Sequence, residues 1–295
     1  MSRNQEPIAL NAIETIALYG FADTNEPIEF HRGVPSRGNS GVFRLSVVDP
    51  LCTEGEPPAP EESTLYAEHP GHEHLELKLG SLLECGRTGY VHAVSCEGPG
   101  ALDVPELVAK ISFPHLRPRL SREAWIYEDL RSLQGAVIPR CYGYFEAQIP
   151  EGMVFMQECH RARRVPNLSG DFEVIVPNIV GILLLERLSN ERLPLNVRFG
   201  KDWCNEIHDL YKEISESFVD VRDIAHGNII RVSRSPHALP SLPGRTTGRV
   251  FEWRVIDLED CVKHTVPRDY HMINFHTQHV DTLLGCLQRG ITNFC

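Results

Sequence analysis

Two short segments in the second half of the chain carry residues that could bind a metal ion. Residues 221–230 contain Asp223 and Asn228, five positions apart and followed by an apolar pair. Residues 255–259 place Asp257 at the end of an apolar run, where a carboxylate can face a cleft. Carboxylate and carboxamide oxygens are the ligands that a hard cation such as Mg²⁺ prefers. We therefore expect Asn228 and Asp257 to be metal ligands.

Lys110 is an unusual charged residue, because it lies among small and branched apolar residues within 107–111. An unpaired ammonium on a half-buried strand would be costly to desolvate, so Lys110 needs a carboxylate. Glu123, in the helix expected next, is the best candidate and Glu128 is the second. Paired in this way, Lys110 would direct its charge toward the phosphates of a nucleotide. The alternative is a lysine on an edge strand whose ammonium stays in water.

A turn with two glycines precedes this lysine. Residues 84–91 read ECGRTGYV, with Gly86 and Gly89 at the second and third glycine positions of a GxGxxGxV loop. Glycine lets the backbone lie close to phosphates because no Cβ blocks the approach. The alternative is that both glycines serve only a tight hairpin turn.

Hydrophobic periodicity predicts the elements that position these residues. A helix is expected over 8–19 and another from Ser121 to Gly135, followed later by two long helical stretches around 203–214 and 273–287. Expected strands lie at 43–47, 75–79, 90–95, 106–113, 143–146, 182–186, 229–232 and 250–256. The run at 182–186 is continuously apolar and should be buried on both faces. Two turn-rich segments, 50–63 and 149–178, separate these elements.

This order of elements indicates an α+β chain, because strands come first and helices later. A small sheet lobe would precede a mainly helical lobe, with a ligand cleft between them. The expected domain organisation is an N-terminal extension over 1–70, an N-lobe over 71–187 and a shortened C-lobe over 188–295.

The motifs together resemble those of the protein-kinase superfamily over about residues 75–261. Their order is the glycine turn, the Val-Ala-Lys strand with Lys110, a helix glutamate, a buried strand ending at 185–188, an Arg-Asp loop with Asp223, and an Asp-Leu-Glu motif at Asp257. The spacing of Asp223 and Asn228 is that of the kinase catalytic loop.

The resemblance implies a two-lobed protein-kinase-like fold with a small antiparallel-sheet N-lobe and an abbreviated helical C-lobe. It implies binding of ATP and Mg²⁺, with possible transfer of the γ-phosphate to a Ser or Thr hydroxyl of a protein substrate. The alternative is a catalytically impaired pseudokinase that acts as a binding or scaffold protein. The implied catalytic residues are Asp223, Lys110 and Glu123, the metal ligands are Asn228 and Asp257, and the nucleotide site comprises Gly86, Gly89, Val91, Ala109, Lys110, Glu186 and Leu188.

Composition limits the partners and the compartment. A net charge of −11 argues against a broad basic face for nucleic acid, and we interpret the cluster of Arg161, Arg163 and Arg164 as a solvated loop. Nine cysteines without a CxxC pair fit a reducing compartment. Neither a signal peptide nor an apolar run of about 20 residues is present, so we expect a cytoplasmic or nuclear protein without a membrane partner.

Two other classes of site are less well supported. The cysteine and histidines within 261–279 lack the close cysteine pair typical of a zinc site. A Ser-His-Asp hydrolase is not indicated because the sequence has no GxSxG motif.

Overall fold

The computed structural model describes residues 8–22, 26–37, 58–98, 104–149, 178–264 and 269–292. The chain divides into two compact units. The first unit comprises Met1–Ser36, Leu65–Ser121 and Tyr142–Glu186, and the second comprises Arg37–Thr64, Arg122–Cys141 and Arg187–Cys295. Each unit is therefore assembled from three separate stretches of sequence.

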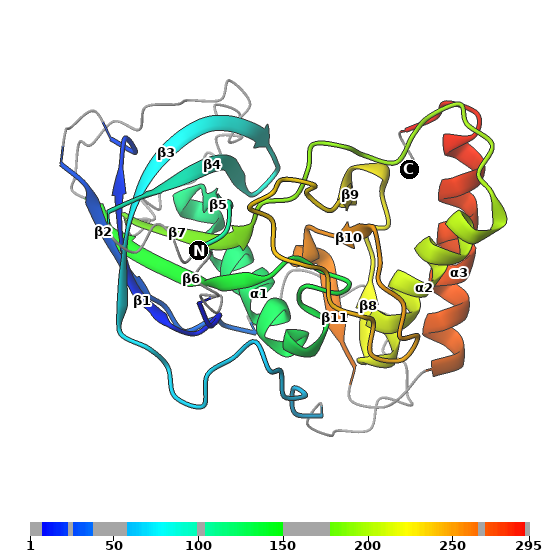
Figure 1. The fold of residues 1–295 in the computed structure, drawn as a ribbon, viewed down its shortest axis with the longest axis horizontal. Helices are drawn as coiled ribbons and strands as arrows, with labels where there is room; N and C mark the ends of the chain where they lie inside the picture. Colours follow the sequence, from blue (N-terminus) through cyan, green and yellow to red (C-terminus); the bar gives the residue numbers. More distant parts are fainter. Residues whose placement is uncertain are drawn as a thin grey trace, which may run out of the picture. The chain divides into compact units, whose positions relative to one another are not determined.

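The first unit is built on a closed seven-stranded β-barrel (Figure 1). Around the barrel the strands follow the order β1-β2-β6-β7-β5-β4-β3. Closure comes from a parallel pairing of β1 with β3, in which Ile16 is opposite Leu75 and Leu18 is opposite Leu77. The strands are β1 (Ile13–Tyr19), β2 (Ile28–Arg32), β3 (Glu73–Cys85), β4 (Gly89–Glu97), β5 (Leu107–Ser112), β6 (Cys141–Gln148) and β7 (Ile179–Glu186).

Alternating apolar side chains fill the barrel, because successive residues of a strand point to opposite faces. On β5 the buried Ala109 and Ile111 belong to this core, so the intervening Lys110 points to the outer face. The core includes Ile16, Leu18, Phe30, Leu75, Leu77, Ala109, Ile111, Phe145, Ile182 and Leu184.

The predicted two-lobed protein-kinase-like fold is wrong, and so is the assignment to that superfamily. In place of a small antiparallel sheet before a helical lobe, the described residues form a closed mixed barrel together with three α-helices. The error begins at β1, which the sequence predicts as a helix. A β-bulge between Ile13 and Thr15 shifts the register, so that Ile13 and Ile16 both face the core at a spacing that mimics a helix.

Most of the other predicted elements are confirmed. The hairpin of β3 and β4 forms, β5 pairs with β4 and β7, and β7 is buried along almost its whole length. Helix α1 (Arg117–Asp129) begins four residues before Ser121, and the short 3₁₀ helix η3 (Arg131–Leu133) separates its end from Gly135. Another short 3₁₀ helix, η2 (Pro114–Leu116), precedes α1.

The second unit contains the two predicted long helices, α2 (Lys201–Glu216) and α3 (Asp269–Leu287), which pack against each other. Two small antiparallel sheets accompany them, one of β9 (Ile229–Arg231) with β10 (Trp253–Val255) and one of β8 (Val219–Val221) with β11 (Cys261–Lys263). The 3₁₀ turns η4 (His226–Asn228) and η5 (Leu258–Asp260) connect these strands.

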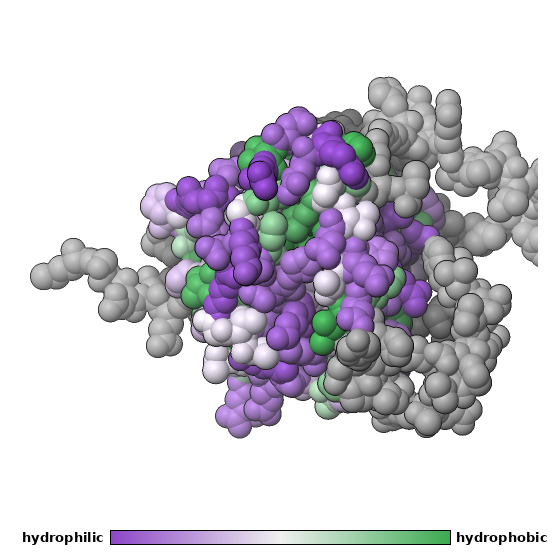
Figure 2. Space-filling view, turned by 90° about the vertical axis from the view of Figure 1, so that its right-hand side faces the viewer, coloured by the Kyte–Doolittle hydropathy of each residue, from purple (hydrophilic) through white to green (hydrophobic). Residues whose placement is uncertain are grey.

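The surface on the side of α2 and α3 is mainly hydrophilic, with hydrophobic residues in small separate groups (Figure 2). Such scattered apolar residues are normal for a folded domain. No helix among the described residues is both long and apolar enough to cross a bilayer.

Several predictions lie outside the described residues. They are the strand at 43–47, most of the acidic segment 50–63, the insertion between Ile149 and Asn178, and the arginine cluster at 161–164.

Candidate metal centre

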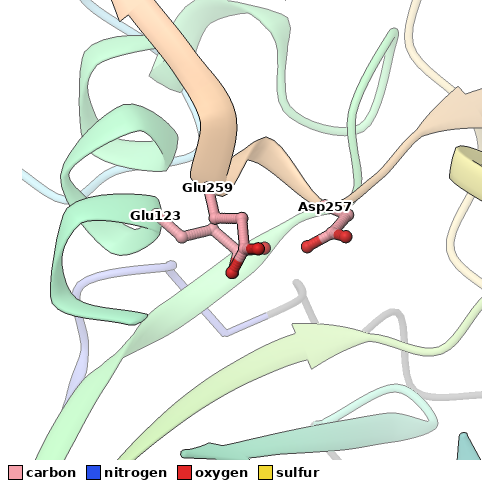
Figure 3. Close-up of side chains that lie close together, drawn as sticks. All are labelled: Glu123, Asp257 and Glu259. Carbon is pink, nitrogen blue, oxygen red and sulfur yellow. The ribbon is translucent and has the colours of Figure 1, made fainter. Parts of the chain in front are cut away.

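Three carboxylates converge in the second unit. Glu123, Asp257 and Glu259 each offer an oxygen, and these oxygens all lie within 4.8 Å of one another. Figure 3 shows the carboxylates of Glu123 and Glu259 side by side and that of Asp257 facing the same space. Glu123 comes from α1, Asp257 is the residue directly before η5, and Glu259 lies within η5.

The three side chains differ in how deeply they are buried. Glu123 is 0% exposed and Glu259 is 4% exposed, while Asp257 is half-buried. Buried carboxylates are stabilised by hydrogen bonds, by basic side chains or by a bound cation.

The turn at Asp257 explains why two acids so close in sequence can share one site. Leu258 lies between them and is completely buried, so its side chain anchors the turn in the core. Asp257 itself has φ of 60° and ψ of 63°, the left-handed conformation that non-glycine residues seldom adopt. Strained backbone of this kind is concentrated at functional sites.

The spacing of the oxygens fits a divalent cation. Metal–oxygen distances are about 2.1 Å for Mg²⁺ and about 2.4 Å for Ca²⁺, so two oxygens on opposite sides of one ion lie at most about 4.2 or 4.8 Å apart. All three oxygens lie within 4.8 Å of one another, which is close enough for them to share one divalent cation after small side-chain movements.

Two neighbouring residues respond to the negative charge of the cluster. Burial raises the pKa of Tyr127 well above its ordinary value, and the charges of Glu123 and Asp257 add to this effect. The pKa of the Cys261 thiol is raised in the same way, first by burial and then by nearby carboxylates that include Glu123 and Asp257. Both groups therefore stay protonated at neutral pH.

The loop that contains Asp223 and Asn228 lies next to the segment ending in Asp257. Asn228 donates from Nδ2 to the carbonyl of Asp223 at 3.0 Å, which closes the loop on itself. Its own carbonyl accepts a hydrogen bond from the backbone N–H of Ile256 at 2.9 Å. Because Nδ2 is engaged, Oδ1 is the atom through which Asn228 could ligate a metal.

The remaining predicted site residues lie in the first unit, except Leu188. Val91 of β4 is opposite Lys110 of β5, which in turn is opposite Leu183 of β7. Ala109 faces the barrel core, and Glu186 ends β7. Leu188 follows in the second unit and is half-buried.

In the turn with two glycines, the structure explains why residue 89 is a glycine. A Cβ at Gly89 would lie 1.8 Å from the carbonyl oxygen of Ile111, so the close approach of β4 and β5 itself requires glycine there. Gly86, in contrast, meets only the carbonyl of Gly89 at 3.8 Å and leaves open space beside the turn.

Sequence reasoning placed Glu123 and Asp257 in the functional site but did not make Glu259 a metal ligand. The signal for it was two acids on either side of a leucine, directly after an apolar strand. Among the residues described, the three carboxylates are the one group of three or more His, Cys, Asp and Glu side chains whose ligand atoms lie this close together.

A row of two buried residues, Ser215 and His276, and the half-buried Asp220 has the composition of a hydrolase triad but not its chemistry. Ser215 donates its hydroxyl proton to the carbonyl of Tyr211 at 2.9 Å, so it must accept from Nδ1 of His276 at 2.6 Å. Nε2 of His276 then accepts from the N–H of Val221 at 3.0 Å, while Asp220 lies farther away at 3.4 Å. The row therefore anchors α3 to α2 and β8.

Comparison of the sequence with protein-family models and with curated proteins finds no match. The site described above therefore has to be interpreted from its own geometry.

Proposed function

We propose that this protein binds a divalent cation, Mg²⁺, through Glu123, Asp257 and Glu259, and that the cation carries the phosphates of ATP. The observation that supports this function is the convergence of the three carboxylates within 4.8 Å. Asn228, whose backbone is bonded to the strand end beside Asp257, is the fourth candidate ligand.

Mg²⁺ is the ion that best links such a site to a nucleotide. It is usually held by a small number of carboxylates and fills its other positions with water and substrate phosphates. Without a cation the three carboxylates repel the phosphates of ATP, so ATP should bind only when the cation is present.

The proposal concerns binding and not phosphate transfer. Asp223 received its role toward a substrate hydroxyl from the resemblance to protein kinases, and the barrel does not support that resemblance. Here Asp223 has a structural part, since its carbonyl accepts the hydrogen bond from Asn228.

Thermal unfolding of the full chain tests the proposal. We expect Mg²⁺ or Mn²⁺ to raise the melting temperature relative to EDTA, ATP alone to have no effect, and ATP with Mg²⁺ to raise it further. A ligand at 100 times its Kd stabilises a protein by about 2.7 kcal/mol.

Variants of the ligands make the test specific. Asp257→Asn and Glu259→Gln should lose the response to Mg²⁺, while Glu62→Gln, a change at an exposed acid of the same unit, should keep it. The proposal fails if the wild type does not respond to either metal, or if the exposed control loses its response as fully as the ligand variants do.

A further inference from the structure

A buried tyrosine near the carboxylates has a hydroxyl without a hydrogen-bond partner among the described residues. Tyr127 is 0% exposed, and its Oη makes no hydrogen bond with any of the described residues. A buried hydroxyl without a partner costs about 1–3 kcal/mol, and phenylalanine would fill the same space without that cost. Its hydroxyl is therefore available to a partner that arrives by binding.

The position of Tyr127 on α1 brings it to the metal centre. It follows Glu123 by four residues, and side chains at this spacing lie on the same face of a helix. The electrostatic influence of both Glu123 and Asp257 on its hydroxyl agrees with this placement.

We infer that Tyr127 is a positioning residue of the cation site, and that its hydroxyl hydrogen-bonds a water molecule coordinated to the cation. The inference rests on the proposed function, because it needs the cation to be bound. Mg²⁺ keeps several water ligands, and in a buried site each of them needs protein partners. A tyrosine hydroxyl can both donate and accept, so it suits this task.

Tyr211 offers a matched control. It is 1% exposed on α2, and its hydroxyl also makes no hydrogen bond with the described residues. Its pKa is raised by burial and then by Cys261 and Asp223, but not by any of the three clustered carboxylates. The substitutions Tyr127→Phe and Tyr211→Phe thus remove the same atom from equally buried sites, and only the first lies beside Glu123.

Chemical unfolding with EDTA and titration with Mn²⁺ test the inference. With EDTA, both phenylalanine variants should be at least as stable as the wild type. Tyr127→Phe should weaken Mn²⁺ affinity by about 10-fold or more, as is typical when a partner of a metal ligand is removed, while Tyr211→Phe should keep wild-type affinity. Water-proton relaxation should show altered hydration of Mn²⁺ in Tyr127→Phe.

Three results would overturn the inference while leaving the cation site in place. The first is wild-type Mn²⁺ affinity in Tyr127→Phe. The second is an equal loss of affinity in Tyr211→Phe. The third is a Tyr127→Phe protein that is already less stable than the wild type with EDTA, which would mean that the hydroxyl has a structural partner. A wild type that does not bind Mn²⁺ would instead overturn the cation site itself and the role of Tyr127 with it.

Discussion

The carboxylates of Glu123 and Asp257 lie within 4.8 Å of each other, although one comes from a helix and the other from a tight turn after a strand. Asp257 has a left-handed backbone conformation, which directs its carboxylate toward Glu123. Asp257 therefore carries both a charge of the cluster and a strained backbone. This combination leads to a prediction about backbone energetics that is independent of metal binding.

Replacing Asp257 with glycine should give a more stable protein than replacing it with alanine. Both changes remove the carboxylate, but a Cβ in the left-handed region costs about 1–2 kcal/mol and glycine avoids this cost. We therefore expect the free energy of unfolding of Asp257→Gly to exceed that of Asp257→Ala by about 1 kcal/mol. Urea unfolding in the presence of EDTA measures this difference.

Asp209, in the middle of α2, provides the opposite case. In a helix interior glycine is less favourable than alanine by about 1 kcal/mol, so the order of the two variants should reverse there. If alanine is the more stable substitution at both positions, the turn at Asp257 does not have the backbone conformation described.

The sequence predicts local elements well where one pattern dominates. The hairpin of β3 and β4 and the apolar stripe of α2 follow directly from their periodicity. It does not predict closure of the barrel, because this depends on a parallel pairing between β1 and β3, whose residues are far apart in the chain. A single bulge between Ile13 and Thr15 was enough to make β1 resemble a helix.

Contacts made by polar residues are harder still to predict. Glu213 lies in α2 at 1% exposure, where its carboxylate accepts hydrogen bonds from the N–H groups of Thr246 and Thr247 and from the Thr247 hydroxyl. Nothing in the sequence links this glutamate to that loop. Glu123 and Asp257 could be predicted as site residues because motifs suggested them, whereas for Glu259 the sequence offered only its place two residues after Asp257, and the structure was needed to bring its carboxylate into the group.

Lys263 and Asp129 form a buried ion pair. Removing one of the two charges should lower the free energy of unfolding more than removing both. Nζ of Lys263 lies 2.7 Å from the carboxylate, and each side chain is 4% exposed. Burial raises the pKa of Asp129 even though Lys263 opposes the rise, so desolvation outweighs the attraction within the pair.

We expect Lys263→Met to lower the free energy of unfolding by about 3–5 kcal/mol, because it leaves a buried carboxylate alone. The double variant Asp129→Leu with Lys263→Met should lie within about 1 kcal/mol of the wild type. Urea unfolding of the two single variants and the double variant measures this coupling. Simple addition of the two single losses would contradict it.

His92 should make the folded state sensitive to mild acid. It lies in β4 at 3% exposure, and its Nδ1 donates to the carbonyl of Gly80 at 3.2 Å. Burial lowers the pKa of His92 below its ordinary value of 6.5, although the hydrogen bond to Gly80 opposes this. Below about pH 6.5 the unfolded chain therefore takes up more protons at this position than the folded protein does, so stability is full above that pH and falls as the pH decreases.

The substitution His92→Asn tests this effect, since its amide can still donate a hydrogen bond to Gly80 but does not titrate. Between pH 7 and pH 5 the wild type should lose more stability than His92→Asn, as measured by urea unfolding at each pH. His31→Asn, at a side chain that is 68% exposed, should retain the pH dependence of the wild type. Equal pH dependence in the wild type and in His92→Asn would show that His92 takes up its proton as readily in the barrel as in the unfolded chain.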